Sequence, residues 1–234
     1  MSGLAEILLK EGFTVSGSDT KESPLTKKLV SEGAHIIYGQ KAENITRDIG
    51  CVVYTAAINR NNPELIEAVA LKIPMLTRAE LLGQLMKNYD TPIAVSGTHG
   101  KTTTTSMISH ILLEGDLDPT ISVGGILKAI GGNIRVGNSG TFITEACEYT
   151  NSFLHFFPKI SVILNIEEDH LDFFKDLEDI RHSFHQFAEL LPEDGTLIIN
   201  AEIKDYAEIY DCLLYTSPTH ETGAYLVCRL LLEK

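Results

Sequence analysis

One segment of the chain, residues 93–105, combines residue types that could bind phosphate; its sequence is IAVSGTHGKTTTT. Gly97 and Gly100 would let the backbone turn tightly and bring its N–H groups close to a polyphosphate, because glycine has no Cβ and tolerates positive φ. A helix over 102–114 would begin at this turn and add unpaired N–H donors and the positive end of its dipole. We interpret the segment as a phosphate-binding loop.

Two side chains in the same segment could contact a bound nucleotide and its metal ion. Lys101 would reach the β- and γ-phosphates of a nucleotide, and Thr102 would place its hydroxyl on Mg²⁺. The strict motif, G-x-x-x-x-G-K-[ST], has a glycine where Val95 stands, so this chain matches a shorter form, G-x-x-G-K-T. The alternative is a strand-to-helix turn whose glycines serve packing and whose lysine is solvated.

Carboxylates follow another predicted strand, which covers residues 141–144. Glu145 and Glu148 come at its carboxyl end, which is the edge where doubly wound sheets bind ligands. A carboxylate at this edge could hold the Mg²⁺ that bridges nucleotide phosphates, because Mg²⁺ prefers hard oxygen ligands. Each glutamate taken alone is also consistent with a solvated loop residue.

A further polar cluster, NIEEDHLD, follows a predicted buried strand at 160–165. His170 in this cluster could ligate a second divalent ion or contact a transferring phosphate. The acidic residues around it are also typical of the first turn of a helix. The order of the motifs favours a site, because all three strand ends fall on the same predicted edge.

A sheet with flanking helices must position these residues. Strand and helix patterns alternate along the whole chain, which predicts an α/β fold with two consecutive doubly wound parallel-sheet modules. Predicted helices cover 4–10, 25–32, 63–70, 78–87, 102–114 and 180–191. Predicted strands cover 13–16, 35–38, 51–54, 75–76, 93–96, 121–123, 141–144, 160–165 and 196–200.

A polar stretch ending in proline, residues 87–92, divides these modules, so we predict domains at 1–87 and 88–211. A dinucleotide-type fold begins with a strand and a glycine-rich turn, whereas Met1 enters the first helix almost directly, so we expect that strand to be missing. Asp19 ends the first remaining strand, where an acidic residue commonly meets a ribose or base, although Gly-Ser-Asp is also ordinary turn chemistry.

The composition sets further limits. The 234 residues carry a formal net charge of -13, which argues against a nucleic-acid-binding surface and requires any phosphate to be held locally. No apolar run could span a bilayer and no secretory signal is evident, so the chain is predicted to be cytoplasmic, without membrane insertion. The four cysteines lack metal-ligand spacing and are expected to be reduced.

Together these motifs resemble the Mur ligase family over residues 1–211. The short phosphate loop is the form that this family uses. The matching strings are MSGLAE (1–6), SGSD (16–19), TAAI (55–58), NPE (62–64), TRAE (77–80), SGTHGKTTT (96–104), GG (124–125), EACEY (145–149), SFLH (152–155) and NIEEDHLD (165–172). The tail, 212–234, matches nothing expected of the family, and CLLYTSP resembles a translated sequencing adapter, so we hypothesise a chimeric gene fragment.

The resemblance implies an ATP-dependent ligase of peptidoglycan precursor synthesis. In this chemistry the carboxylate of UDP-N-acetylmuramate attacks the γ-phosphate of ATP, and the amine of L-alanine captures the resulting acyl phosphate. The first module would hold the UDP-sugar and the second would hold ATP with Mg²⁺. The third domain of the family, which binds the amino acid, is missing here, so we expect this fragment to be inactive by itself.

The resemblance also implies site residues. Lys101, Glu145 and His170 would be catalytic; Thr102 and Glu145 would bind the Mg²⁺ of ATP, and His170 a second Mg²⁺. Cys147 stands where the family has Asp, which puts the role of that position in doubt. The residues expected at ATP are Gly97, Thr98, His99, Gly100, Lys101, Thr102 and Thr103, and those expected at the UDP-sugar are Ser18, Asp19, Thr55 and Ala56.

Other functions remain open at this point. A related ligase attaches a recycled peptide to UDP-N-acetylmuramate, and its distinguishing amino-acid domain would lie in the missing part. Folylpolyglutamate synthase shares the ATP module but should lack a UDP-sugar module. A non-catalytic nucleotide-binding fragment is the alternative from another class.

Overall fold

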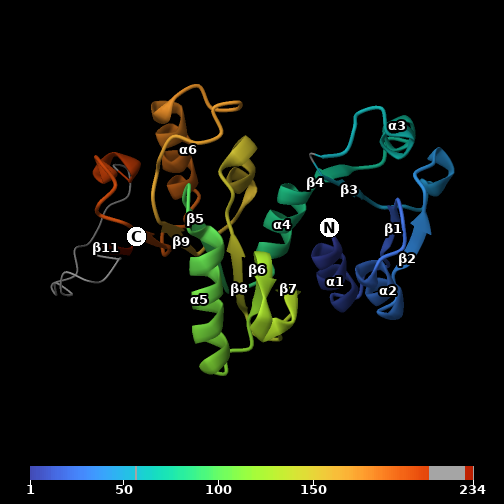
Figure 1. The fold of residues 1–234 in the computed structure, drawn as a ribbon, viewed down its shortest axis with the longest axis horizontal. Coiled ribbons are helices and arrows are strands. Elements are labelled where there is room, and N and C mark those ends of the chain that lie inside the picture. The colour runs from blue at the N-terminus through green and yellow to red at the C-terminus, as the bar shows by residue number, and fades with distance from the viewer. Residues whose placement is uncertain (56, 211–229, 234) are drawn as a thin grey trace. The chain divides into compact units, whose positions relative to one another are not determined.

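The computed structural model describes residues 1–55, 57–210 and 230–233. It divides into two compact units, Met1–Leu82 and Gly83–Lys234, which we call unit 1 and unit 2 (Figure 1). The division falls inside helix α4 (Arg78–Met86), a few residues before the predicted limit at residue 87. Each unit is described by itself below.

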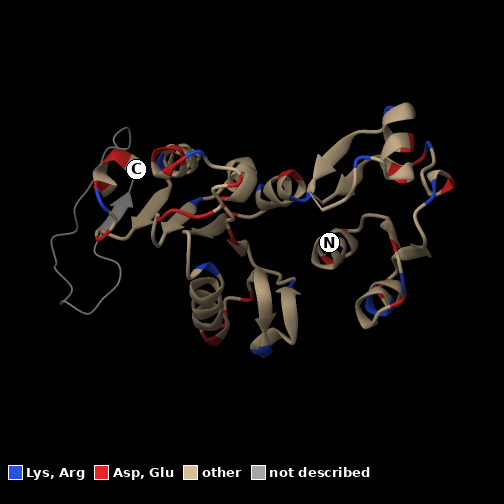
Figure 2. Cartoon of the chain, turned by 45° about the horizontal axis from the view of Figure 1, so that its top comes forward, with Lys and Arg blue, Asp and Glu red and all other residues tan. Residues whose placement is uncertain are grey.

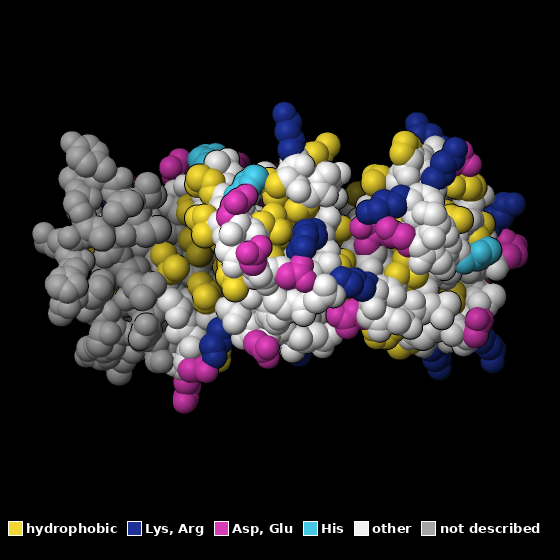
Figure 3. Space-filling view, turned by 90° about the horizontal axis from the view of Figure 1, so that it is seen from below, with side chains coloured by type: hydrophobic (Ala, Val, Ile, Leu, Met, Phe, Trp, Pro, Cys, Tyr) yellow, Lys and Arg dark blue, Asp and Glu magenta, His cyan; other side chains and the backbone are white. Residues whose placement is uncertain are grey.

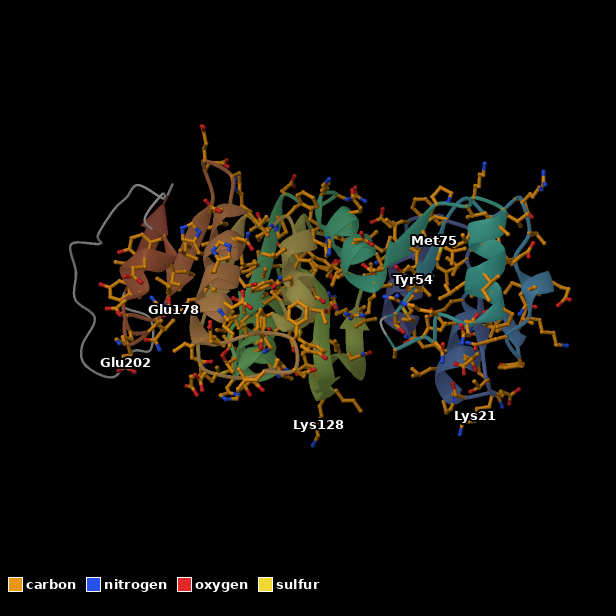
Figure 4. The ribbon with its side chains drawn as sticks, turned by 90° about the horizontal axis from the view of Figure 1, so that it is seen from above. Lys21, Tyr54, Met75, Lys128, Glu178 and Glu202 are labelled. Atoms are coloured by element: carbon orange, nitrogen blue, oxygen red, sulfur yellow. The ribbon has the colours of Figure 1, made fainter. Side chains whose placement is uncertain are left out.

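Unit 1 alternates short helices and strands around two parallel strand pairs. Strand β1 (Ser16–Asp19) pairs with β2 (His35–Tyr38), and β3 (Val52–Tyr54) pairs with β4 (Met75–Thr77). Tyr54 and Met75, labelled in Figure 4, mark this second pair. The helices of the unit are α1 (Ser2–Lys10), α2 (Pro24–Ser31) and α3 (Pro63–Ala70), with the 3-10 helix η1 (Ala42–Asn44).

The predicted strand at 13–16 is wrong, because the strand begins only at Ser16. Gly12 has φ of 87°, and the N–H of Phe13 donates to the carbonyl of Leu8 at 2.9 Å. The N–H of Gly12 donates to Leu9 at 3.0 Å, which completes a Schellman ending of α1. The apolar residues that suggested a strand therefore terminate the preceding helix.

Unit 2 is built on a seven-stranded sheet in the order β11-β10-β9-β5-β8-β6-β7. The five inner strands pair in parallel and the two edge strands pair antiparallel. Their bounds are β5 (Thr91–Ser96), β6 (Thr120–Leu127), β7 (Gly132–Arg135), β8 (Thr141–Glu145), β9 (Ile160–Ile163), β10 (Thr196–Ile199) and β11 (Leu230–Glu233).

The α/β class with parallel sheets is confirmed, and the antiparallel edges are an addition to it. Strand β7 was not predicted; it follows η2 (Lys128–Ile130) and a turn at Gly131, whose φ is 66°. Lys128 extends from this turn in Figure 4. The hypothesis about the tail at 212–234 stays untested, because 211–229 and 234 lie outside the described residues.

The helices of unit 2 pack on this sheet through apolar side chains. They are α5 (Lys101–Glu114) and α6 (Leu177–Glu189), with the 3-10 segments η3 (Tyr149–His155) and η4 (Tyr206–Ile209). The sheet core contains Val95, Ile121 and Ile143, all fully buried. Phe153 of η3 stacks on Phe187 of α6 with ring centroids 4.6 Å apart. The segment that follows β8 is therefore fixed to the core.

Charged residues of both signs are interspersed over each unit (Figure 2). On the face in Figure 3, acidic, basic and histidine side chains lie among exposed hydrophobic ones. Within the part of the chain that the structure describes, none of the helices has both the length and the apolar character needed to cross a membrane.

Candidate phosphate-binding site

The loop between β5 and α5 has the backbone that the sequence predicts. Gly97 has φ of 139° and Gly100 has φ of 83°, in the region that favours glycine. A Cβ on Gly97 would lie 3.0 Å from Cβ of Leu164, so the close approach of the segment that follows β9 also requires glycine. Gly100 is the N-cap of α5, and no side chain caps that helix end. The N–H groups of the first turn can therefore serve an anion.

The strand order brings three loops together at one edge. Strand β5 lies between β8 and β9 and runs parallel to both, so the residues after these three strands emerge side by side. Figure 1 shows α5 following β5 in this central position. The segments that carry Glu145 and His170 consequently flank the loop.

Lys101 bends back over its own loop. Its Nζ donates to the carbonyls of Gly97 and Thr98 at 2.6 and 3.1 Å. The same atom lies 3.0 and 2.9 Å from the two carboxylate oxygens of Glu148, which follows β8. The side chain of Glu148 is only 3% exposed. The sequence offered Glu148, like Glu145, as a carboxylate that could hold Mg²⁺, but its contact with Lys101 was not predicted.

Thr102 and Glu145 contact each other, as a shared metal site would require. The Thr102 hydroxyl donates to Glu145 Oε2 at 3.0 Å, and the N–H of Gly124 donates to Oε1 at 2.5 Å. A Cβ on Gly124 would lie 2.8 Å from Oε2, and one on Gly125 would lie 3.2 Å from Cγ2 of Thr102. These two glycines of β6 therefore make room for the hydroxyl–carboxylate pair.

His170 lies beside Glu148. Its Nε2 is 3.9 Å from Glu148 Oε1 and 3.8 Å from Asp169 Oδ2, and its ring is 4.5 Å from that of Tyr149. The Tyr149 hydroxyl donates to Asp172 at 2.7 Å, and this bond raises the pKa of Tyr149 above its usual range. His170 has φ of 53°, a left-handed conformation that few non-glycine residues adopt.

The remaining loop residues are held by the segment after β9. The side-chain amide of Asn165 accepts from the N–H of His99 at 2.8 Å and donates to its carbonyl at 3.0 Å. The Thr98 hydroxyl accepts from the N–H of Glu167 at 2.9 Å. Thr98 is buried, whereas His99 and Thr103 are exposed. Sequence reasoning missed Asn165, although it belongs to the NIEEDHLD string.

The donor set fits Mg²⁺ at one position. Thr102 and Glu145 offer a hydroxyl and a carboxylate, which are hard oxygen ligands, and Mg²⁺ keeps several waters when it binds few protein groups. Among the described residues, no group of three or more His, Cys, Asp and Glu side chains is arranged to hold a metal ion. Thr102 and Glu145 contact each other, whereas His170, the third predicted metal ligand, contacts Glu148.

Cys147 lies between the two glutamates in sequence and is exposed. Partial desolvation of its sulfur raises the pKa of the thiol above its usual range, so the thiol is neutral at physiological pH. The position therefore adds no charge to the site. The role of Cys147 stays open.

The residues predicted for a UDP-sugar lie in unit 1 and bond to their own surroundings. Asp19 Oδ1 accepts from the N–H of Thr20 at 2.6 Å, and the Thr55 carbonyl accepts from the N–H of Ile58 at 3.1 Å. Ser18 and Asp19 end β1, and Thr55 follows β3, so they sit at carboxyl ends of two different strand pairs. Ala56 lies outside the described residues.

A buried carboxylate connects helix α3 with strand β1 and the 3-10 helix η1 in unit 1. Glu64, at the start of α3, is 7% exposed and accepts hydrogen bonds from Ser18 Oγ and Asn44 Nδ2, both at 2.6 Å. Asn62 caps α3 by accepting from the N–H of Glu64 at 2.8 Å. The NPE string thus ties the helix end to β1.

The fold defines an α/β protein whose second unit carries a glycine-containing loop between β5 and α5, the candidate phosphate site. Residues 1–90 match the model for "Mur ligase family, catalytic domain", and residues 95–214 match the model for "Mur ligase middle domain". The second match alone spans half of the chain. The chain belongs to the Mur ligase family.

Two curated relatives of this chain carry the same name. The UDP-N-acetylmuramate--L-alanine ligase of Agathobacter rectalis is 67% identical over 209 residues, which cover 89% of this chain and 46% of that protein. The ligase of the same name from Lachnospira eligens is 60% identical over 219 residues, covering 92% of this chain and 48% of that protein. The chain therefore spans about half the length of the curated relatives it matches.

Solved structures agree with this family. UDP-N-acetylmuramate-alanine ligase MurC from Thermotoga maritima has a TM-score of 0.77 at 29% identity, covering 89% of this chain and 48% of that one. UDP-N-acetylmuramate:L-alanyl-gamma-D-glutamyl-meso-diaminopimelate ligase from Neisseria meningitides has a TM-score of 0.80 at 28% identity, covering 91% and 71%.

Proposed function

We propose that the chain is part of an ATP-dependent ligase that joins L-alanine to the carboxylate of UDP-N-acetylmuramate. One observation carries most of the proposal: a chain 67% identical to a ligase of that name has its loop lysine and threonine in contact with acidic side chains at the neighbouring strand ends. In the proposed role unit 1 binds the UDP-sugar and unit 2 binds ATP.

The reaction consists of two transfers. A carboxylate oxygen of the sugar bonds to the γ-phosphorus as the bond to ADP breaks, and the alanine amine then attacks the acyl carbon and releases phosphate. Lys101 neutralises charge on the phosphoryl oxygens, and the loop N–H groups orient the phosphates. The rate enhancement comes from positioning and charge neutralisation, because the protein forms no covalent bond itself.

Thr102 and Glu145 are the residues proposed to hold Mg²⁺ with ATP, and His170 a second ion. Mg²⁺ bound there would supply positive charge at the nucleotide phosphates. Glu145 has both oxygens occupied by Thr102 and the Gly124 N–H, so its carboxylate is already oriented toward the loop.

A hybrid enzyme tests this proposal. The matching 209-residue part of the Agathobacter rectalis ligase is replaced by the corresponding residues of this chain, and L-alanine-dependent phosphate release is measured. We expect activity in the hybrid and a loss of about 100-fold with Lys101→Ala. Lys128→Ala removes a lysine at the β6–β7 turn and serves as the matched control. Full activity in the Lys101→Ala hybrid would refute the role of the loop.

The peptide-recycling ligase is a second candidate, because the Neisseria structure with that activity in its name has a TM-score of 0.80. The two candidates differ in the acceptor amine. Phosphate release by the complete gene product, measured with L-alanine and with the tripeptide in parallel, distinguishes them. We expect L-alanine to be the better acceptor, in keeping with the 67% identity.

A further inference from the structure

The loop lysine has no donor left for a phosphate in this structure. An ammonium group has three N–H donors. The Nζ of Lys101 uses them on the Gly97 carbonyl at 2.6 Å, the Thr98 carbonyl at 3.1 Å and the Glu148 carboxylate at 2.9 Å. Any phosphate that binds to Lys101 must therefore replace one of these acceptors.

The Glu148 carboxylate is the acceptor that competes most strongly. It is the charged member of the three, and both of its oxygens lie within 3.0 Å of Nζ. Hydrogen bonds between charged groups are about twice as strong as those between neutral groups. A phosphate would also be repelled by this carboxylate, because both are anions at close range.

The backbone fixes Glu148 in this place. Its carbonyl accepts from the N–H of Asn151 at 2.9 Å, and the Cys147 carbonyl accepts from the N–H of Phe153 at 3.0 Å. The ring of Phe153 is fully buried against α6. Thr150 and Asn151 turn the chain with φ of 55° and 56°. The carboxylate therefore has little freedom to withdraw when a ligand arrives.

We infer that Glu148 is an internal competitor for the phosphate-binding lysine and sets the nucleotide affinity of the loop. This inference rests on the proposed function, because it assumes that the loop binds a nucleotide. Displacement of Lys101 leaves Glu148 buried, with the imidazole of His170 3.9 Å away. Leaving a buried carboxylate without its counter-charge is costly, so the exchange weakens binding.

The test is nucleotide binding by the 234-residue chain, measured by titration calorimetry with ADP and ATP without Mg²⁺. Glu148→Gln keeps the shape of the side chain and removes its charge. We expect it to tighten binding of both nucleotides about tenfold, the equivalent of one charge-assisted hydrogen bond. Adenosine, which lacks phosphate, should bind the parent and the variant equally.

Two further variants separate competition from a structural effect. Glu168→Gln removes one negative charge from the exposed segment that follows β9 and is the matched control, expected to change affinity less than twofold. Glu148→Asp keeps the charge but shortens the side chain, so its affinity should fall between those of the parent and Glu148→Gln. Glu148→Gln should tighten nucleotide binding less when Lys101 is replaced by alanine than when Lys101 is present.

The outcomes distinguish the inference from the proposed function. If no variant and no parent binds ATP or ADP, the nucleotide-binding role of the loop is wrong. If the parent binds and Glu148→Gln binds equally or more weakly, the loop is a nucleotide site but Glu148 is not a competitor. Equal tightening with and without Lys101 would also overturn the inference, because the effect would then be general electrostatics.

Discussion

The candidate sites of the two units differ in what their predicted residues contact. In unit 2, Lys101 and Thr102 reach acidic side chains from a neighbouring strand end, at 2.9 and 3.0 Å. In unit 1, Asp19 bonds to the N–H of the next residue, and Ser18 bonds to Glu64, which was not predicted to belong to a site. Only the tertiary fold can make contacts between residues more than forty positions apart, and in unit 2 one of them joins two predicted site residues, Thr102 and Glu145.

The two candidate sites differ because one is formed by a contiguous loop and the other by residues at separate strand ends. A phosphate loop is contiguous, so a few residues with special φ values determine the whole cradle. Polar residues at strand ends in unit 1 can satisfy their hydrogen bonds locally, as the turn at Asp19 does. Unit 1 also has a long-range polar network, in which Glu64 accepts from Ser18 and Asn44.

The largest contrast should come from matched glycine substitutions. Gly97→Ala places a Cβ 3.0 Å from Leu164 at φ of 139°, whereas Gly17→Ala in β1 meets only Ile36 at 3.8 Å. We expect Gly97→Ala to cost about 3 kcal/mol of unfolding free energy and Gly17→Ala less than about 1 kcal/mol. Urea denaturation followed by circular dichroism measures both. Equal losses would mean that the loop is no more constrained than an ordinary strand.

Glu64 tests the network of unit 1. Glu64→Ala leaves the partly buried Ser18 hydroxyl and Asn44 amide without this acceptor, at a cost of about 2 kcal/mol. Nucleotide binding in unit 2 should stay unchanged, since none of these residues belongs to the loop. Glu67→Ala on the same helix is the control, because Glu67 is only partly buried. A loss of ATP binding with Glu64→Ala would contradict the separation of the two sites.

Asn165 tests whether the clamp on the loop matters for binding. Asn165→Ala removes two hydrogen bonds to the backbone of His99, so we expect a loss of about 1 kcal/mol in stability and several-fold weaker ATP binding. Asn133→Ala on the edge strand β7 is the control, because that side chain is exposed. Calorimetric titration with ATP gives the binding effect. Unchanged affinity would show that the two Asn165 hydrogen bonds are not needed to hold the loop for binding.

Sequence patterns predicted the parts of the site that are local. The glycines of the loop, the helix after it and the acidic ends of β8 and β9 each depend on a short run of residues. The pairing of Lys101 with Glu148 and the clamp of Asn165 on His99 could not be predicted, because they join residues 47 and 66 positions apart. The edge strand β7 was missed for a different reason: its partner β6 is near in sequence, but its four residues, GNIR, show no alternating apolar pattern.

The smallest expected effect concerns Asp118, which precedes β6 and pairs with Arg135 at the end of β7; neither residue belongs to a candidate site. The Arg135 guanidinium, followed by hydrogen bonds from Asn138, lowers the pKa of Asp118 to about 2. A carboxyl group whose pKa is lowered on folding stabilises the protein above its unfolded pKa, and the stabilisation is lost as pH falls from near 4 through about 2. The Asp118→Asn variant should therefore have a slightly lower thermal midpoint than the parent at pH 6. The difference between the two midpoints should become smaller near pH 2. If the difference between the two thermal midpoints stayed constant across that pH range, the ion pair would add nothing to stability. A change in ATP affinity at pH 6 would mean that the Asp118–Arg135 pair is coupled to the loop.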